Sequence, residues 1–303
     1  MAFVPWHDHR ELIYAAYVVW WWDRTPAKLQ AVDVAISNAI NTPYVKKKNG
    51  MTIEVDELGK AYSAMDQADM GSILIEVGSV ANRPDLVNLG YSCLLVLLTL
   101  EKDGGLRRRK DGVSWFHAMT SRDNKSPGGT LNKHLVAVRE LLECSKTLRT
   151  LGQFGRANDL YKAGMEGLLQ LVSDPYPNLG DFIVRYKGDL YPRSWLYYAV
   201  SFSKKTGYHL DNGYKNATYH SFVLYLIYLI KDILGNDFPT AKFQNFKIDN
   251  KKVIRFIFDT YMLKKAEGVH SNGACKKGDF SGFSQNNGRL LTLEEEDYFR
   301  NTY

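Results

Sequence analysis

Two polar segments that each lead into an apolar helix contain the residue types best suited to proton transfer. Tyr219 and His220 lie just before the apolar run 223–230. Asn132 and His134 open another helical segment earlier in the chain. A phenol can donate a proton, and an imidazole titrates near neutrality. The pattern is compatible with two helix starts that face one cleft.

Each of these residues also has a plainer interpretation. Asn132 has the side chain of a helix N-cap, and His134 has that of a buried, hydrogen-bonded histidine. Tyr219 would equally suit helix packing in a chain with 19 tyrosines. The sequence alone leaves these alternatives open.

Several residues between the two segments are candidates for binding an acidic ligand. Arg185 alternates with Ile183 in an extended segment, so we expect it to point inward, and a guanidinium binds a carboxylate through two hydrogen bonds. The long irregular region 102–129 contains aromatic residues that favour an ordered loop over a cleft. The further candidates for substrate binding are Trp115, His117, Tyr191, Arg193, Asn216 and His220.

The charge of the chain favours an anionic partner. The net charge is +6, and basic residues gather in short runs such as 46–48 and 107–110. A positive field attracts polyanions, although each run alone is typical of a solvated turn. We expect an anionic polysaccharide, with no nucleic acid. No apolar run approaches the roughly 20 residues needed to span a bilayer.

Metal and cofactor chemistry is poorly supported by the sequence. The three cysteines lack metal-ligand spacing, and Cys93 and Cys144 have the surroundings of buried thiols. His7 and His9 resemble a metal pair without a third ligand, and phosphate-binding or metalloprotease motifs are absent. We predict no metal and no cofactor. The first residues lack a signal-peptide pattern, so export is expected only if a leader has been removed.

The sequence predicts that the elements positioning these residues are helices joined by Gly and Pro turns. Helical pairs without a short repeat favour an all-α fold, and we predict a single α/α toroid over residues 1–303 with long loops at one rim. Residues 268–303 read as a loop-rich tail with a short helix. The expected helices are 9–22, 25–40, 57–80, 84–101, 130–151, 154–173, 193–205, 217–234 and 250–267.

The pattern also predicts one enclosed helix and two short extended segments. The helix 9–22 is apolar on more than one face, so we expect it to be enclosed by other elements. Short extended segments are expected at residues 51–55 and 181–186.

Part of the chain resembles known enzymes of uronate chemistry. Residues 160–168 match a Leu-Tyr-x-x-Gly-Met-Glu-x-Leu segment of the toroid domain of glucuronyl C5-epimerases. Residues 182–185 are similar to that family's Tyr-x-x-Arg element, and Tyr219-His220 to its Asp-Tyr-His element. The segment 132–134 partly resembles the Asn-Asn-His helix start of toroidal alginate lyases. The epimerase tyrosine is Phe182 here, and 303 mostly helical residues leave no room for that family's β domains. These departures favour a lyase.

The resemblance implies β-elimination on a uronate polymer. His134 would act as the base or as the partner of Tyr219, which would protonate the leaving oxygen, while Asn132 and Arg185 would neutralise the substrate carboxylate. A C5-epimerase shares the first step. A glycoside hydrolase would need two facing carboxylates, for which Asp66, Asp69, Asp181 and Asp189 are candidates. A non-catalytic helical protein that binds an acidic polymer or a protein is the remaining alternative.

Overall fold

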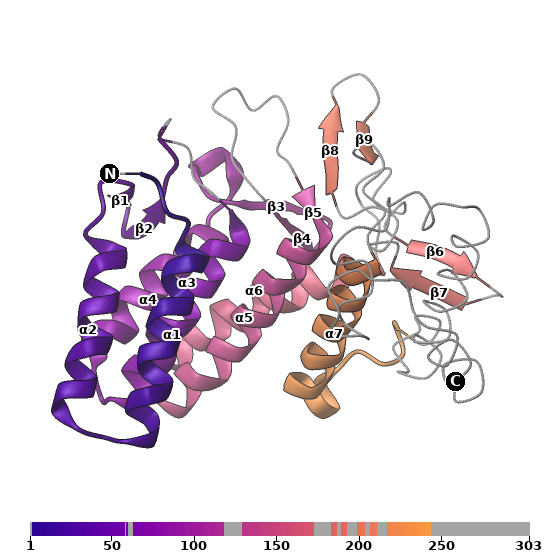
Figure 1. The fold of residues 1–303 in the computed structure, drawn as a ribbon. Helices are drawn as coiled ribbons and strands as arrows, with labels where there is room; N and C mark the ends of the chain where they lie inside the picture. Colours follow the sequence, from indigo (N-terminus) through magenta and orange to yellow (C-terminus); the bar gives the residue numbers. More distant parts are fainter. Residues whose placement is uncertain are drawn as a thin grey trace, which may run out of the picture. The chain divides into compact units, whose positions relative to one another are not determined.

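The computed structural model describes most of the chain up to residue 243 (Figure 1). The described residues are 2–57, 59, 63–117, 129–172, 183–186, 189–192, 199–203, 207–210 and 217–243. Of these, residues 129–130 and those between 183 and 224 are described by their backbone alone.

The described part is mainly α-helical, as the sequence predicts. Its helices are α1 (Trp6–Trp22), α2 (Pro26–Ile40), α3 (Ala64–Val80), α4 (Pro84–Leu98), α5 (Leu131–Thr150), α6 (Phe154–Leu169) and α7 (Ala217–Leu234), with short 3₁₀ turns η1 (Glu101–Asp103) and η4 (Gly235–Asp237). The expected starts and ends agree within a few residues for most helices, but α3 begins at Ala64 instead of residue 57. No described helix is both long and apolar enough to cross a bilayer.

Two β-hairpins interrupt the helices of the first half. Strand β1 (Val45–Lys48) pairs antiparallel with β2 (Met51–Glu54), and β3 (Arg107–Lys110) pairs with β4 (Val113–Phe116). Their two-residue turns are Asn49-Gly50 and Asp111-Gly112, all with positive φ. Asn-Gly and Asp-Gly are strong hairpin signals. The sequence thus contains a signal for both hairpins, although the sequence prediction includes only the extended segment 51–55.

Helices α3 and α4 pack with their backbones in close contact. A Cβ atom on Gly90 would lie 2.6 Å from the Gly71 carbonyl oxygen, and one on Gly71 would lie 2.6 Å from the Leu94 side chain. Gly78 meets Val87 in the same way. Since no larger residue fits, these glycines determine how closely the two helices approach.

Helices α1, α2 and α3 share one apolar core. Trp6, Ile13, Tyr17 and Trp20 of α1 are buried in it. The opposite face of α1 is solvent-exposed at Leu12, Val19 and Trp22. The prediction that this helix is enclosed is therefore wrong. Figure 1 shows α1 to α6 running side by side.

Helix α6 packs against α5 through small residues. A Cβ atom on Gly164 would meet Leu142, and one on Gly167 would meet Val138 and Phe116. Ser145 of α5 donates a hydrogen bond to the Ala157 carbonyl at 2.8 Å. Cys93 and Cys144 are buried thiols, as expected.

Contacts divide the chain into two compact units. The first contains residues 1–129 and 133–170, and the second contains residues 130–132 and 171–303. The second unit has the hairpins β6–β7 (Ile183–Tyr186 and Asp189–Pro192) and β8–β9 (Ala199–Ser203 and Gly207–Leu210), followed by α7. A two-residue strand, β5 (Gly129–Thr130), precedes α5. The predicted helix 193–205 is wrong at residues 199–203, which form β8. The single domain and the toroid stay predictions.

Candidate functional site

His134 lies in the core, with both ring nitrogens engaged. The Phe116 N–H donates to Nδ1 at 3.2 Å, and Nε2 lies 3.0 Å from the Gly167 carbonyl oxygen. This geometry requires the proton on Nε2 and therefore a neutral ring. Burial lowers the pKa of His134 to about 3. In this arrangement neither nitrogen is available to a substrate, which corresponds to the plainer interpretation of a hydrogen-bonded core histidine.

Trp115 and His117 are also buried, at 1% and 0% exposure. The Trp115 ring stacks on His134 with centroids 4.2 Å apart. His117 Nε2 lies 3.4 Å from Glu101 Oε2, and burial lowers the pKa of His117. The 102–117 segment thus contributes its aromatic residues to the core of the first unit. Neither residue has the solvent-facing position that substrate binding requires.

The other predicted site residues are only partly described. Asn132 is buried at 6% exposure near the start of α5. Arg185 lies on β6, Tyr191 on β7, and Tyr219 and His220 in the first turn of α7, all without described side chains. Arg193 and Asn216 lie outside the described residues, as do Asp181 and the helix predicted at 250–267. The roles of these residues therefore stay predictions.

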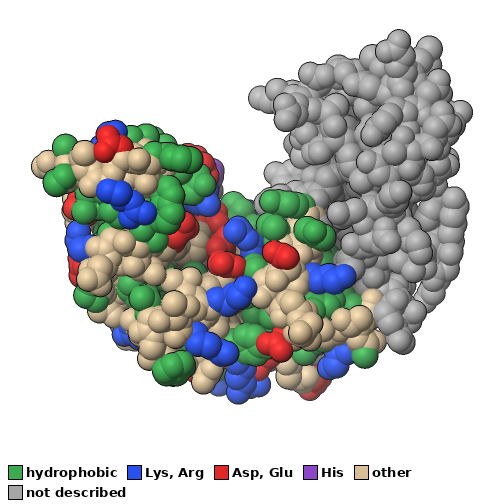
Figure 2. All heavy atoms as spheres, turned by 90° about the horizontal axis from the view of Figure 1, so that it is seen from below, with side chains coloured by type: hydrophobic (Ala, Val, Ile, Leu, Met, Phe, Trp, Pro, Cys, Tyr) green, Lys and Arg blue, Asp and Glu red, His purple; other side chains and the backbone are tan. Residues whose placement is uncertain are grey.

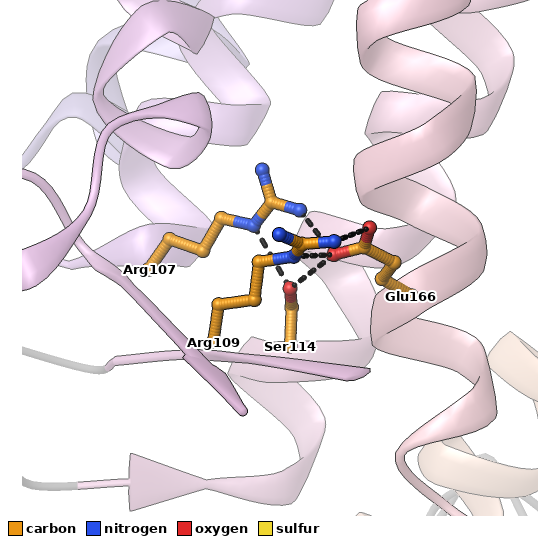
Figure 3. A network of polar contacts seen from close by, with 4 residues as sticks. All are labelled: Arg107, Arg109, Ser114 and Glu166. Atoms are coloured by element: carbon orange, nitrogen blue, oxygen red, sulfur yellow. Dashed lines mark hydrogen bonds and ion pairs between the residues drawn. The ribbon is translucent and has the colours of Figure 1, made fainter. Parts of the chain in front are cut away.

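One ionic network involves the segment that bears the family resemblance (Figure 3). Glu166 of α6 accepts hydrogen bonds from Arg107 and Arg109 of β3 and from Ser114 of β4, at 2.5 to 3.0 Å. The arginines alternate along the strand and so share one face. Although Glu166 is largely buried, these partners lower its pKa. The matched segment thus fixes the β3–β4 hairpin to α6.

A second network in the first unit gathers carboxyl groups instead. Burial, followed by repulsion from Glu140, raises the pKa of Asp69 to about 8. Glu140 is 3% exposed, and burial raises its pKa although Arg139 contacts it at 2.5 Å. Arg10 and Arg139 act on both carboxyl groups. Since the pKa of Asp69 lies above neutral pH, its protonated form predominates at pH 7.

The network continues through Asp66 to Glu54. Burial and the neighbouring Asp66 raise the pKa of Glu54 to about 9, and burial raises the pKa of Asp66. The Trp6 N–H donates to Glu54 Oε1 at 2.6 Å. Lys133 adds positive charge near Asp66, and His7 Nδ1 lies 3.3 Å from Asp66 Oδ1. Both carboxyl side chains are essentially inaccessible, at 1% and 0% exposure.

The carboxyl groups of Glu54, Asp66, Asp69 and Glu140, together with their basic neighbours, form what we call the acid network. Its basic side chains lie nearer to the solvent than its carboxyl groups: those of His7, Arg10 and Arg139 are 44%, 26% and 32% exposed. Figure 2 shows acidic and basic side chains close to one another on the described surface. An anion that approaches would meet these basic side chains before the buried carboxyl groups beneath them. This arrangement is able to bind a carboxylate and to exchange protons with it.

The sequence indicates only part of this site. Asp66 and Asp69 are sequence candidates for the carboxylates of a hydrolase, and their i, i+3 spacing places them on one face of α3. Sequence reasoning misses Glu54 and Glu140 because they come from a strand and a distant helix, which only the fold brings together. The one sequence signal for Glu54 is that it is the only charged residue of the extended segment 51–55.

Comparison with known proteins does not assign a family. No family model and no curated protein matches this chain. Among the described residues, no group of three His, Cys, Asp or Glu side chains is arranged to hold a metal ion. We therefore infer a function from the acid network and from the residues already named.

Proposed function

We propose that this protein is a polysaccharide lyase that cleaves a uronic-acid-containing polysaccharide by β-elimination, on an α/α toroid. The observation that favours this function is the acid network, where a protonated Asp69 lies beside Arg10 and Arg139. The mainly helical fold and the resemblance to uronate-acting enzymes agree with it. Tyr219 and Arg185 stay predicted members of the site.

The chemistry explains why such a network is useful. The C5 proton of a uronate is very weakly acidic while the adjacent carboxylate is charged. Groups that neutralise this carboxylate stabilise the charge that develops when the proton leaves. A carboxylic acid kept neutral at pH 7 can donate a hydrogen bond for this purpose, and guanidinium groups add charge. Asp69, Arg10 and Arg139 combine both kinds of group.

A glycoside hydrolase is the second candidate. Hydrolysis requires one protonated carboxyl group to protonate the leaving oxygen, and the raised pKa of Asp69 meets this requirement. A C5-epimerase would use the same neutralising groups as a lyase but return a proton to C5. A protein that only binds the polymer would use the cations alone.

The test is turnover of a panel of uronate polymers, followed by the ultraviolet absorbance of the C4=C5 double bond. We expect wild-type activity, and a loss of about 100-fold in kcat for Asp69→Ala, because alanine cannot donate a hydrogen bond to the substrate carboxylate. Lys146→Gln, an exposed change on α5, is the matched control and should keep full activity. Chain cleavage without absorbance would favour the hydrolase, and full activity of Asp69→Ala would contradict the role of Asp69.

A further inference from the structure

The outer face of α1 carries an apolar stripe whose residues have heptad spacing. The stripe consists of Leu12, Ala15, Val19 and Trp22. Steps of three, four and three residues place these side chains on one side of a helix. Leu12, Val19 and Trp22 are 63%, 52% and 83% exposed, and Ala15 is exposed as well. A stripe with this spacing is the surface through which two helices pair side by side.

The N-terminal end of the stripe is acidic. Asp8 and Glu11 lie one turn or less before Leu12, and their side chains are 56% and 66% exposed. Glu11 pairs with Arg10 at 2.7 Å, and Asp8 lies 2.9 Å from the neighbouring His7 ring. Two carboxylates beside one guanidinium group make this end of the helix acidic.

The C-terminal end of the stripe is basic. Arg24 lies two residues beyond the end of α1, with its guanidinium group 4.2 Å from the centroid of the Trp21 ring. Its Nε donates to the Trp21 carbonyl oxygen at 3.3 Å, which holds the cation at the helix end. Lys28, in the first turn of α2, pairs with Asp23 at 2.5 Å. Two cations beside one carboxylate make this end basic.

We propose that this face of α1 binds the same face of a second copy of the chain, with the two helices antiparallel. The stripe is symmetric about residue 17, so a two-fold axis at that point places Leu12 opposite Trp22 of the copy. The same axis places Ala15 opposite Val19 of the copy. Each apolar side chain thus gains an apolar partner, as an interface between identical surfaces requires.

The charges at the two ends determine the direction of the pairing. In the antiparallel arrangement, the acidic end of each helix lies beside the basic end of its partner. A parallel pair would bring Asp8 and Glu11 of both copies together and would be opposed by like charges. A membrane fits this face less well than a second copy, because anionic lipid head groups would repel the same two carboxylates. The inference does not depend on the proposed lyase function.

Self-association of the full chain tests this interface, measured by sedimentation equilibrium over a range of protein concentrations. The wild-type molar mass should rise towards twice that of the chain. Val19→Glu should raise the dissociation constant of the dimer roughly 100-fold, because each copy would bury a carboxylate without a partner. Phe154→Glu is the matched control on α6, where the side chain is 61% exposed, and it should leave the dissociation constant unchanged.

Charge reversal tests the antiparallel arrangement itself. Glu11→Lys and Arg24→Glu should each weaken the dimer about 10-fold when studied alone. An equimolar mixture of these two variants should associate about as tightly as the wild type. In the mixed dimer the introduced lysine meets the introduced glutamate, and the unchanged Arg24 meets the unchanged Glu11.

Three results would overturn the inference. They are a wild-type chain that stays monomeric up to about 1 mM, a dimer that Val19→Glu leaves unchanged, and variants that associate no better mixed than alone. A monomeric chain that binds vesicles of anionic phospholipid, and loses this binding in Trp22→Ala, would assign the face to a membrane instead. None of these results bears on turnover of uronate polymers, so the lyase function is tested separately.

Discussion

Two ionic networks in the first unit use the same residue types with opposite results. Around Glu166, two arginines and a serine surround one carboxylate, and its pKa falls. Around Asp69, the strongest charged neighbour is another carboxyl group, and the pKa rises to about 8. Burial disfavours ionisation in both places, so the sign of the neighbours decides the outcome. The Glu166 network therefore holds the β3–β4 hairpin against α6. In the acid network, by contrast, Asp69 keeps a proton at neutral pH.

The largest expected effect is loss of the Glu166 network. Glu166→Ala should lower the free energy of unfolding by about 3 kcal/mol, because it leaves two arginines without their carboxylate. Urea denaturation measures this change. The control is Glu11→Gln, which removes an exposed ion pair with Arg10 and should cost less than about 1 kcal/mol. Equal effects would contradict the difference between buried and exposed pairs.

The second-largest expected loss of stability comes from a steric clash at the contact between α3 and α4. Gly90→Ala places a methyl group 2.6 Å from the Gly71 carbonyl oxygen. We expect a loss of about 2 kcal/mol in stability by overpacking. Thermal unfolding measures it, with Gly155→Ala as control, since a Cβ atom there meets nothing within 4 Å. A neutral Gly90→Ala would mean that α3, which bears Asp66 and Asp69, is not held by this contact.

The acid network should also make stability depend on pH. Glu54 has a pKa of about 9 in the fold, against 4.5 for an unperturbed glutamate. The folded state thus binds more protons than the unfolded state between these values, and stability must fall as pH rises from about 5 to 9. Glu54→Gln should flatten this slope, because the glutamine amide binds no proton in this pH range. Melting temperatures measured across this range would contradict the prediction if both proteins showed the same slope.

The smallest effect concerns the two basic runs. Lys46 to Lys48 are exposed on β1, whereas Arg107 to Arg109 bind internal carboxylates. Replacing the three lysines by Gln should weaken retention on an anionic polysaccharide column severalfold and leave stability within about 0.5 kcal/mol. The control replaces Lys146, Lys162 and Lys231, which changes the net charge equally. Equal loss in both variants would indicate attraction by net charge alone.

The sequence predicts most helices because apolar periodicity and Pro caps are local signals. Pro26 and Pro84 mark the starts of α2 and α4 where the structure has them. Strand β8 lies in a segment for which the sequence predicts a helix, because its alternation, Ala199 to Ser203, is short and directly follows the aromatic-rich residues 195–198. Pairing with β9 makes this segment a strand, and the residues of the segment alone do not show that pairing.

The candidate site is less predictable than the fold. His134 stands at the start of a helix, which suggests a cleft, but its partners are the backbone of Phe116 and Gly167 from other elements. The partners of Asp69 come from α1 and α5. Raised pKa values arise from such distant neighbours, so a sequence shows the carboxyl groups without showing which of them retain a proton.

The most direct test of lyase chemistry counts two products of the same reaction. Wild-type protein would digest a uronate polymer while double bonds are measured by ultraviolet absorbance and new reducing ends by chemical titration. We predict one double bond for each new reducing end, since β-elimination produces both at every cleavage. Reducing ends without double bonds, or no cleavage of any uronate polymer, would contradict the proposal that this acid network supports lyase chemistry.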